Sequence, residues 1–466
     1  MLDPTSATAS GPPLLVLLVT GLLANLPSGV SEASVAAGDD EVAPAEDVDL
    51  PLHLRGVDPN GRIPKVALPP ELPHPHRWRY LPEGRLSDGN IFERFLTSTF
   101  ILPIVSFDSD IGTLLGLSLT DIDFRNRRRR EFATTTFTYS TEGQQGYSVG
   151  WRRWLDQLEL EGGGVVQEER SFVQAGGGYE RTLTRRFFGI GPESREGDET
   201  SFTDETTRLG ASYRRALPER GGDFIAGLGA FVEHRNLARG HKSKLPSTDD
   251  SFPELFDDGD GIDSLWVEGE LSYDLRDSQA NPYRGGSLTG WLKGTPLMTA
   301  GRGGAVYGLR GNWVIEVPGL VHRGGDADEE HPPTDVLALS LQAEDSSGNL
   351  PFWALPSLGG SHRMRGYIAN RWTDSAAWFA AAEYRFVCIP RGVSLTERVH
   401  VERLGMALFY ELGAVGPSSW ELDASPVRSS YGFSMRAGLD RADVFRLDLG
   451  FSDEGVNFAA RYGLSF

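Results

Sequence analysis

Two arginines in a glycine-rich stretch are the residues of this chain best placed to recognise another charged group. The stretch 358–367 reads LGGSHRMRGY, with Arg363 and Arg365 between glycines that permit tight turns. A guanidinium holds carboxylates through paired hydrogen bonds. Glu383 and Glu411 lie on the non-aliphatic sides of two later alternating segments, so both are candidate partners. We expect the stretch to fold into an enclosed space with Arg365 as the donor; the alternative is a surface loop with solvated arginines.

Other chemistry is less well supported by the sequence. Residues 146–150 fit G-x-S-x-G, but Ser148 opens an alternating segment, whereas a hydrolase needs this serine on a strand-to-helix turn. The acidic run 257–261 resembles a calcium loop, yet Gly269 stands where an EF-hand requires glutamate, which favours an acidic loop tip. The nine histidines have no metal-binding spacing. We expect no enzyme activity, no metal and no cofactor.

Composition narrows the class of protein. The formal charge of −20 argues against nucleic acid as a partner, and a single cysteine, Cys388, excludes an internal disulfide. The short apolar run 14–26 and the small residues after it predict a signal peptide over 1–36. Prolines and acids over 37–90 predict an extended, disordered linker. No other apolar run is long enough for a membrane-spanning helix. Strands of alternating polarity can cross a membrane without such a run.

From residue 91 onward the chain reads as an all-β domain, a sixteen-stranded antiparallel transmembrane β-barrel. Short segments of alternating polarity recur, and their polar faces carry glycine with scattered charges, as expected of a lumen. In the last segment Phe458, Tyr462 and Leu464 are expected to face lipid, and Asn457 and Arg461 the lumen. The sixteen expected strands are Thr113–Phe124, Phe132–Thr141, Gly146–Leu155, Leu158–Glu168, Val173–Leu183, Thr206–Leu217, Phe224–Arg235, Ser264–Arg276, Gly285–Lys293, Ala305–Val317, Asp335–Glu344, Ala376–Cys388, Arg403–Val415, Ser430–Leu439, Val444–Phe451 and Asn457–Phe466.

A basic cluster follows the first expected strand. If the N-terminus is periplasmic, this strand runs outward, so the cluster lies near the outer surface, where phosphorylated lipid headgroups, including lipopolysaccharide, are its natural partners. A solvated turn is the equally weighted alternative. The cluster comprises Arg125, Arg127, Arg128, Arg129 and Arg130.

Three motifs resemble the outer-membrane assembly-factor barrel superfamily, the bacterial surface antigen or BamA/TamA type. The segment 409–413, FYELG, is similar to the family's F-x-D-x-G element, with Glu411 replacing the usual aspartate. The segment 273–285 resembles its strand-turn-strand signature. The family's apolar-Arg-Gly-aromatic loop signature, between the eleventh and twelfth strands, is matched by Met364, Arg365, Gly366 and Tyr367.

The resemblance implies a protein of the bacterial outer membrane that takes part in outer-membrane protein or lipid assembly or translocation. Its implied partners are outer-membrane lipid, the cell's barrel-insertion machinery and client outer-membrane proteins. Tyr462, Leu464 and Phe466 match the terminal strand by which such barrels are themselves assembled. The periplasmic POTRA domains of the family have no counterpart in the proline-rich segment, so we expect a member without them. A passive pore or structural barrel is the alternative function, and a hydrolase in the barrel mouth is a less favoured one.

Overall fold

The computed structural model consists mainly of one antiparallel sheet. Among the described residues, this sheet contains sixteen strands in the order β2-β3-β4-β5-β8-β9-β10-β11-β12-β13-β14-β17-β20-β21-β22-β23. The described residues are 68–81, 90, 92–93, 98–108, 112–160, 164–256, 261–322, 329, 332–396, 399–440 and 443–466. The sheet strands are β2 (Thr99–Asp108), β3 (Gly112–Asp121), β4 (Glu131–Ser140), β5 (Gln145–Trp154), β8 (Phe172–Phe187), β9 (Thr200–Leu217), β10 (Phe224–Arg239), β11 (Ile262–Asp274), β12 (Gly285–Met298), β13 (Gly303–Val317), β14 (Asp335–Asn349), β17 (Ala376–Ile389), β20 (Arg403–Gly416), β21 (Arg428–Asp440), β22 (Asp443–Ser452) and β23 (Gly455–Tyr462).

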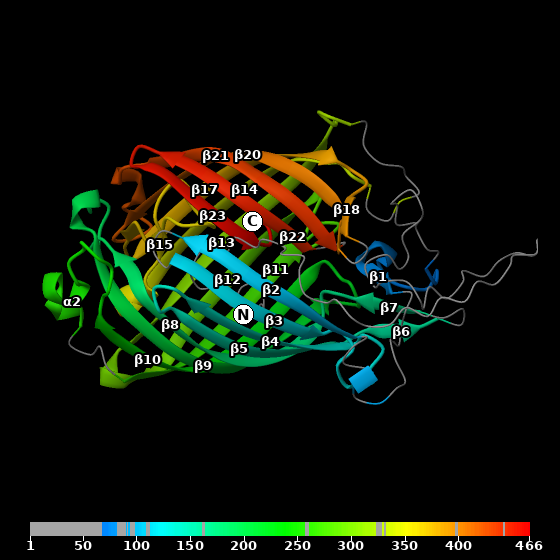
Figure 1. The fold of residues 1–466 in the computed structure, drawn as a ribbon, viewed down its shortest axis with the longest axis horizontal. Coiled ribbons are helices and arrows are strands. Elements are labelled where there is room, and N and C mark those ends of the chain that lie inside the picture. The colour runs from blue at the N-terminus through cyan, green and yellow to red at the C-terminus, as the bar shows by residue number, and fades with distance from the viewer. Residues whose placement is uncertain are drawn as a thin grey trace, which may run out of the picture.

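The sheet curls round until its first and last strands, β2 and β23, come side by side (Figure 1). In the described part of the chain no hydrogen-bonded ladder joins these two strands. Pro103 lies within β2, and proline is tolerated in an edge strand because its missing N–H faces away from the ladder. The predictions of an all-β fold and antiparallel pairing are confirmed. None of the described helices has the length and apolar character needed to cross a membrane.

Alternation along the strands separates two faces of the sheet. In β20, Leu408 and Tyr410 are 55% and 50% exposed, whereas their neighbours Phe409 and Glu411 are 4% and 0% exposed. A period of two in a strand produces this separation. The outward-facing positions of many strands hold large exposed apolar side chains, among them Leu209, Leu228, Leu271, Leu309, Leu341 and Tyr431.

One strand of the sheet was missed and one expected strand lies outside it, so the number of strands agrees although two assignments are wrong. The sheet begins with β2, which the alternation did not identify because its run of apolar residues is interrupted by Pro103. The expected strand 158–168 is instead a small hairpin of β6 (Gln157–Glu159) and β7 (Val165–Glu168) outside the main sheet. Its alternating residues pack against other apolar side chains of this hairpin's own cluster, such as Val166 against Trp78.

Part of the expected linker is structured. Residues 68–81 contain the turn η2 (Pro75–Arg77) and the strand β1 (Trp78–Leu81), which pairs with β7. Arg77 donates to the Gly221 carbonyl oxygen at 2.5 Å and so ties this segment to the β9–β10 turn. The predicted signal peptide, residues 1–36, lies outside the described residues, as does most of the predicted linker.

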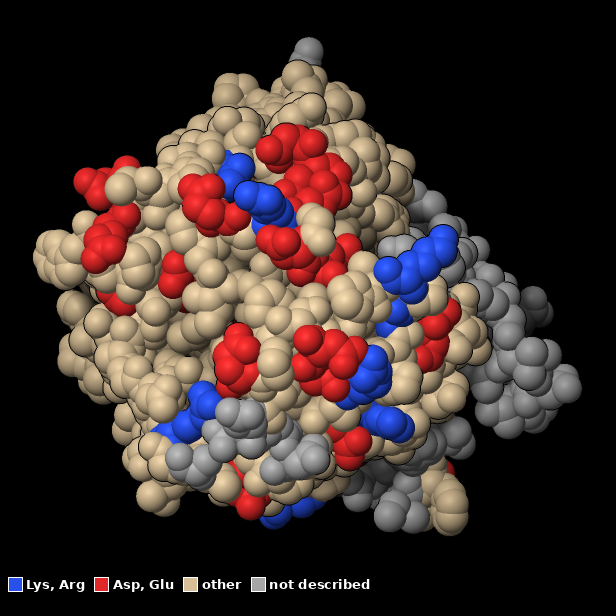
Figure 2. Space-filling model, turned by 90° about the vertical axis from the view of Figure 1, so that its left-hand side faces the viewer, with Lys and Arg blue, Asp and Glu red and all other residues tan. Residues whose placement is uncertain are grey.

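The sheet has two different ends. The loop end carries the connections 188–199, 240–261 and 350–375, and includes the short helices α2 (Thr248–Ser251) and η5 (Pro253–Leu255). Acidic side chains gather over this end (Figure 2). The turn end carries the connections 218–223 and 275–284 and the β1-β7-β6 sheet. The remaining short elements are η3 (Phe124–Asn126), η4 (Glu196–Asp198), η6 (Thr299–Gly301), η7 (Phe352–Ala354), η8 (Leu422–Ala424), β15 (Ser357–Leu358), β16 (Trp372–Thr373), β18 (Val393–Thr396) and β19 (Val399–Val401).

The basic cluster lies at the turn end, so its predicted place near the loop end is wrong. The missed strand β2 is the physical reason, because it reverses the direction expected for β3, β4 and β5, between which the cluster lies. Arg128 forms an ion pair with Glu159 of β6 at 2.5 Å, and Arg130 donates to the Trp154 carbonyl oxygen at 2.9 Å. Arg125 pairs with Glu131. Arg125, Arg128 and Arg130 therefore form contacts within the protein.

The C-terminal residues turn inward rather than continuing the last strand. β23 ends at Tyr462, and Gly463 adopts φ +84°, a left-handed conformation that favours glycine. Phe466 then packs against Val314 and Val336 on the inner face of the sheet. The predicted lipid-facing strand through Leu464 and Phe466 is wrong, because alternation in sequence continues where the backbone does not.

Candidate functional site

The connection 350–375 lies on the inner face of the sheet at the loop end. Its two flanks pair with each other through β15 and β16, so the segment between them forms a closed loop. Two backbone hydrogen bonds hold the loop tip: the Gly360 N–H donates to the Tyr367 carbonyl oxygen at 3.0 Å, and the Tyr367 N–H donates to the Met364 carbonyl oxygen at 3.0 Å. Met364 is fully buried and adopts φ +56°, which is rare for a residue with a Cβ.

The structure brings Arg365 together with Glu411 and Glu383. The Arg365 Nε donates to Glu411 Oε1 at 2.7 Å, and the Arg365 backbone N–H donates to Glu411 Oε2 at 2.6 Å. The Arg365 Nη2 lies 2.9 Å from Glu383 Oε2. All three side chains are completely buried. Opposite charges at these distances, away from water, hold the loop tip to β17 and β20.

Three further residues complete the surroundings of Arg365. Asp448 Oδ1 lies 3.6 Å from Arg365 Nη1, and Ser430 donates to Glu411 at 2.8 Å. The Arg365 guanidinium stacks 3.5 Å above the centre of the Phe409 ring, a cation–π contact. Sequence reasoning named Phe409 only as part of the 409–413 motif and did not select Ser430 or Asp448, although alternation along β21 and β22 places both on the inward face.

The loop backbone reaches the sheet through two glycines. A Cβ added to Gly366 would lie 2.4 Å from the Phe451 carbonyl oxygen. A Cβ added to Gly450 would lie 2.4 Å from the Arg365 carbonyl oxygen. Glycine at both positions therefore allows two backbones to meet without a side chain between them.

Tyr367 anchors the other side of the loop tip. Its hydroxyl donates to Asp453 at 2.5 Å or to the Ser429 carbonyl oxygen at 3.0 Å. Burial, followed by the hydrogen bond to Asp453, raises the pKa of Tyr367, so the phenol remains protonated and able to donate. Asn457 of β23 donates to the carbonyl oxygens of both Arg365 and Tyr367, each at 3.1 Å.

Arg363, the other arginine of the loop, takes a different partner. It forms an ion pair with Glu344 of β14 at 2.5 Å, and its side chain remains 28% exposed. The neighbouring His362 lies 2.9 Å from the Arg461 guanidinium. The two arginines are thus held by different carboxylates, and only Arg365 is sealed from water.

The other sequence candidates do not form a second site. Ser148 lies in the middle of β5, opposite Thr136 and Gly178 in the two ladders, rather than on a strand-to-helix turn. Residues 257–260 of the calcium-like run lie outside the described residues. Where the chain is described, no group of three or more His, Cys, Asp or Glu residues could hold a metal ion.

Comparisons with known proteins give structural neighbours only. No family model matches the chain, and no curated protein matches it. The chain is similar to the crystal structure of BamA from Haemophilus ducreyi lacking POTRA domains 1–3, with 12% identity and a TM-score of 0.49, over 79% of this chain and 70% of that one. It is also similar to CdiB from Acinetobacter baumannii, with 8% identity and a TM-score of 0.43, over 78% of this chain and 59% of that one.

Proposed function

We propose that this chain is a transmembrane β-barrel of the bacterial outer membrane, of the type that assembles or translocates outer-membrane components, and that it is not an enzyme. The observation that carries the proposal is the division of the sheet into an apolar outward face and a charged inward face. Leu228 and Leu309 are 68% and 60% exposed, while inward-facing Glu383 and Arg446 are 0% exposed. An outward surface of this kind suits the hydrocarbon of a bilayer.

Closure of the sheet between β2 and β23 belongs to this proposal. The two strands already lie side by side, and a closed barrel leaves no open edge in contact with lipid. The loop end then faces the exterior and the turn end the periplasm, which suits the long connections 240–261 and 350–375 at the loop end. Outer-membrane lipid is the implied surrounding medium.

The buried loop supports the assembly or translocation type over a plain pore. The loop 350–375 enters the interior, where Glu383, Glu411 and Asp448 hold its Arg365. The motif 364–367, with its resemblance to the assembly-factor signature, lies at the centre of this arrangement. Client outer-membrane proteins and the cell's insertion machinery are the partners that this function requires.

Adjacent residues on opposite faces provide the test of membrane topology. Leu309 and Arg310 are neighbours on β13, and both are exposed. With Cys388 replaced by serine, we expect Arg310→Cys to react with a sulfonated, water-soluble maleimide and Leu309→Cys to react only with a lipid-soluble one. Equal reaction of both cysteines with the water-soluble reagent contradicts a lipid-facing outer surface.

Depletion of the protein tests the assembly role separately. We expect the abundance of folded outer-membrane proteins or of surface lipid to fall after depletion, and an Arg365→Ala copy to restore it poorly. An unchanged outer membrane, together with steady conductance of the purified protein in planar bilayers, indicates a passive pore instead.

A further inference from the structure

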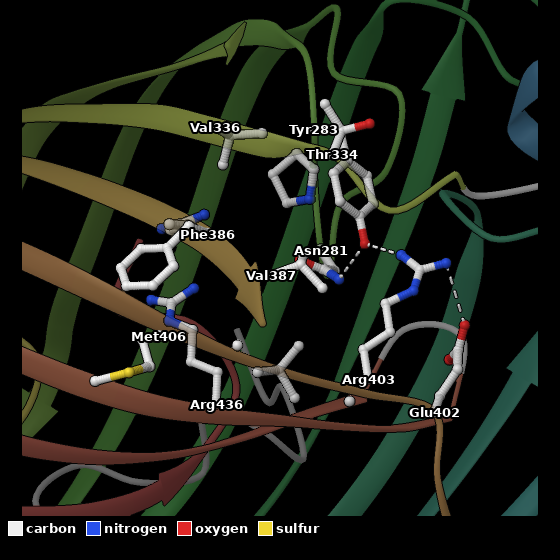
Figure 3. Close-up of a pocket in the computed structure, with 15 residues that line it drawn as sticks. Asn281, Tyr283, Thr334, Val336, Phe386, Val387, Glu402, Arg403, Met406 and Arg436 are labelled. Atoms are coloured by element: carbon white, nitrogen blue, oxygen red, sulfur yellow. Dashed lines mark hydrogen bonds and ion pairs between the residues drawn. The ribbon is translucent and has the colours of Figure 1, made fainter. Parts of the chain in front are cut away.

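A hollow at the turn end lies apart from the Arg365 loop. It is lined by the turn-end parts of β14, β17, β20, β21 and β22 and by the β11–β12 turn, which reaches across to them (Figure 3). Tyr283 of that turn accepts a hydrogen bond from Arg403 at the start of β20. The hollow measures about 610 Å³, including space open to solvent.

The charged residues that line this hollow are mostly basic. Arg385, Arg403 and Arg436 line it together with Glu402, so three arginines against one glutamate leave a formal charge of +2. Arg403 is paired with Glu402 at 3.4 Å. Arg385 and Arg436 both draw on Glu383, the carboxylate that Arg365 also uses. One carboxylate thus faces three guanidinium groups.

The register of the last strands adds more positive charge beside the hollow. Arg436 of β21 is directly opposite Arg446 of β22, which is directly opposite Arg461 of β23. Side chains at such paired positions lie about 5 Å apart at Cβ, and like charges there are destabilising. Asp448 compensates Arg446, but the row still concentrates positive charge on one part of the inner wall.

Two buried donors in the lining have no acceptor within the described protein. The Arg385 Nη1 and the Arg436 Nε are buried and make no hydrogen bond. Arg385 is 6% exposed, and the side chain of Arg436 is 9% exposed. A buried N–H of a charged group without an acceptor is costly, so these donors call for an acceptor that enters the hollow.

We propose that this hollow is a binding site for a phosphate group, carried by a soluble phosphate ester or by a lipid headgroup. Guanidinium groups bind phosphate oxygens in paired hydrogen bonds, and a tetrahedral phosphate accepts from several directions at once. The Phe466 main-chain oxygen accepts from Arg385 Nη2 at 3.2 Å, which leaves Nη1 of the same guanidinium for an oxygen of the ligand. Rings of arginine or lysine select anions and phosphate in membrane pores by the same chemistry. The site goes beyond the proposed function and does not depend on it.

The test uses the full chain in a neutral detergent and inorganic phosphate as the probe. Binding is measured by titration calorimetry at constant ionic strength, with chloride as the replaced anion. We expect Arg403→Gln to weaken phosphate binding at least about tenfold, the effect of losing a charge-assisted hydrogen bond. Glu402→Gln, which removes the negative charge from the lining, is expected to strengthen binding. Arg310→Gln, on the inner face but outside the lining, is the matched control and is expected to bind as the parent does.

Arg403→Gln and Glu402→Gln are neighbours with opposite expected effects on phosphate affinity. A general loss of folding would weaken binding in both, so it cannot produce this result. Parent-like binding by all three variants, or no binding by the parent, overturns the proposal. Reconstitution in phosphatidylcholine vesicles with and without phosphatidylglycerol then separates the two sources. Loss of phosphate binding when phosphatidylglycerol is present identifies a lipid headgroup, and unchanged binding identifies a soluble phosphate; either outcome supports the site.

Discussion

Arg365 and Arg436 share the carboxylate of Glu383 but lie in different electrostatic surroundings. Around Arg365, each terminal nitrogen faces a carboxylate, because Glu383 and Asp448 flank it while Glu411 accepts from its Nε. Around Arg436, one of the two ladder partners is another arginine, Arg446, and the carboxylate that Arg436 contacts is the shared Glu383. The first arrangement is neutralised by the protein itself and fixes a loop. In the second, Arg365, Arg385 and Arg436 share one carboxylate, Glu383, so positive charge is left in excess on this part of the inner wall.

The largest expected effect is the loss of Arg365. Arg365→Ala leaves the fully buried Glu411 without its ion-pair partner, whereas Glu383 keeps Arg385 and Arg436, so we expect the free energy of unfolding to fall by about 3–5 kcal/mol. Arg363→Ala is the matched control on the same loop; its side chain is 28% exposed, so we expect a loss of about 1 kcal/mol or less. Urea unfolding in detergent, followed by heat-modifiable migration, measures both. Equal losses contradict the contrast drawn between the two arginines.

The coupling between Arg365 and Glu411 is the next largest effect. We expect Glu411→Ala to resemble Arg365→Ala, and the double variant to be little less stable than either single one. Interacting partners in a buried network couple by about 0.5–3 kcal/mol. Simple addition of the two single effects in a double-mutant cycle excludes a working contact between the two side chains.

Gly450 provides a test through the backbone rather than through charge. In Gly450→Ala the new methyl group meets the Arg365 carbonyl oxygen at 2.4 Å, and neither backbone can retreat without moving the loop. We expect a loss of about 1–3 kcal/mol, as for an overpacked core. Gly269→Ala is the control, because its nearest neighbour is a leucine side-chain atom at 3.8 Å. A Gly450→Ala variant as stable as Gly269→Ala shows that the loop does not rest on β22.

The smallest expected effect concerns the C-terminal tail beside the arginine-lined hollow. Phe466→Ala removes a partly buried ring from Val314, Val336 and Ala338, so we expect a loss of about 1–2 kcal/mol. Phe458→Ala on the outward face of β23 is the control and should leave unfolding in detergent nearly unchanged. The amount of folded protein in the outer membrane, measured for the same two variants, tests the predicted assembly signal. A larger defect for Phe458→Ala in both assays indicates that the tail packing has no role.

Much of the candidate site follows from the alternation of the sequence alone. A period of two places Glu383 and Glu411 on one face of neighbouring strands, whatever the exact strand ends are. An arginine between glycines is then the natural partner of two inward carboxylates, and the structure places Arg365 between them. Whether a side chain faces inward depends on its odd or even position along the strand. The predicted face is therefore correct even when the strand ends are wrong by several residues.

Only the tertiary structure decided which segments enter the sheet, which way they run and what meets across it. The hairpin 157–168 and the strand β2 were exchanged because short apolar runs look alike until their partners are known. That exchange moved the cluster at Arg125–Arg130 to the other end of the molecule. The inward turn at Gly463 and the row Arg436–Arg446–Arg461 depend on backbone conformation and strand register, which arise from contacts between residues far apart in the chain.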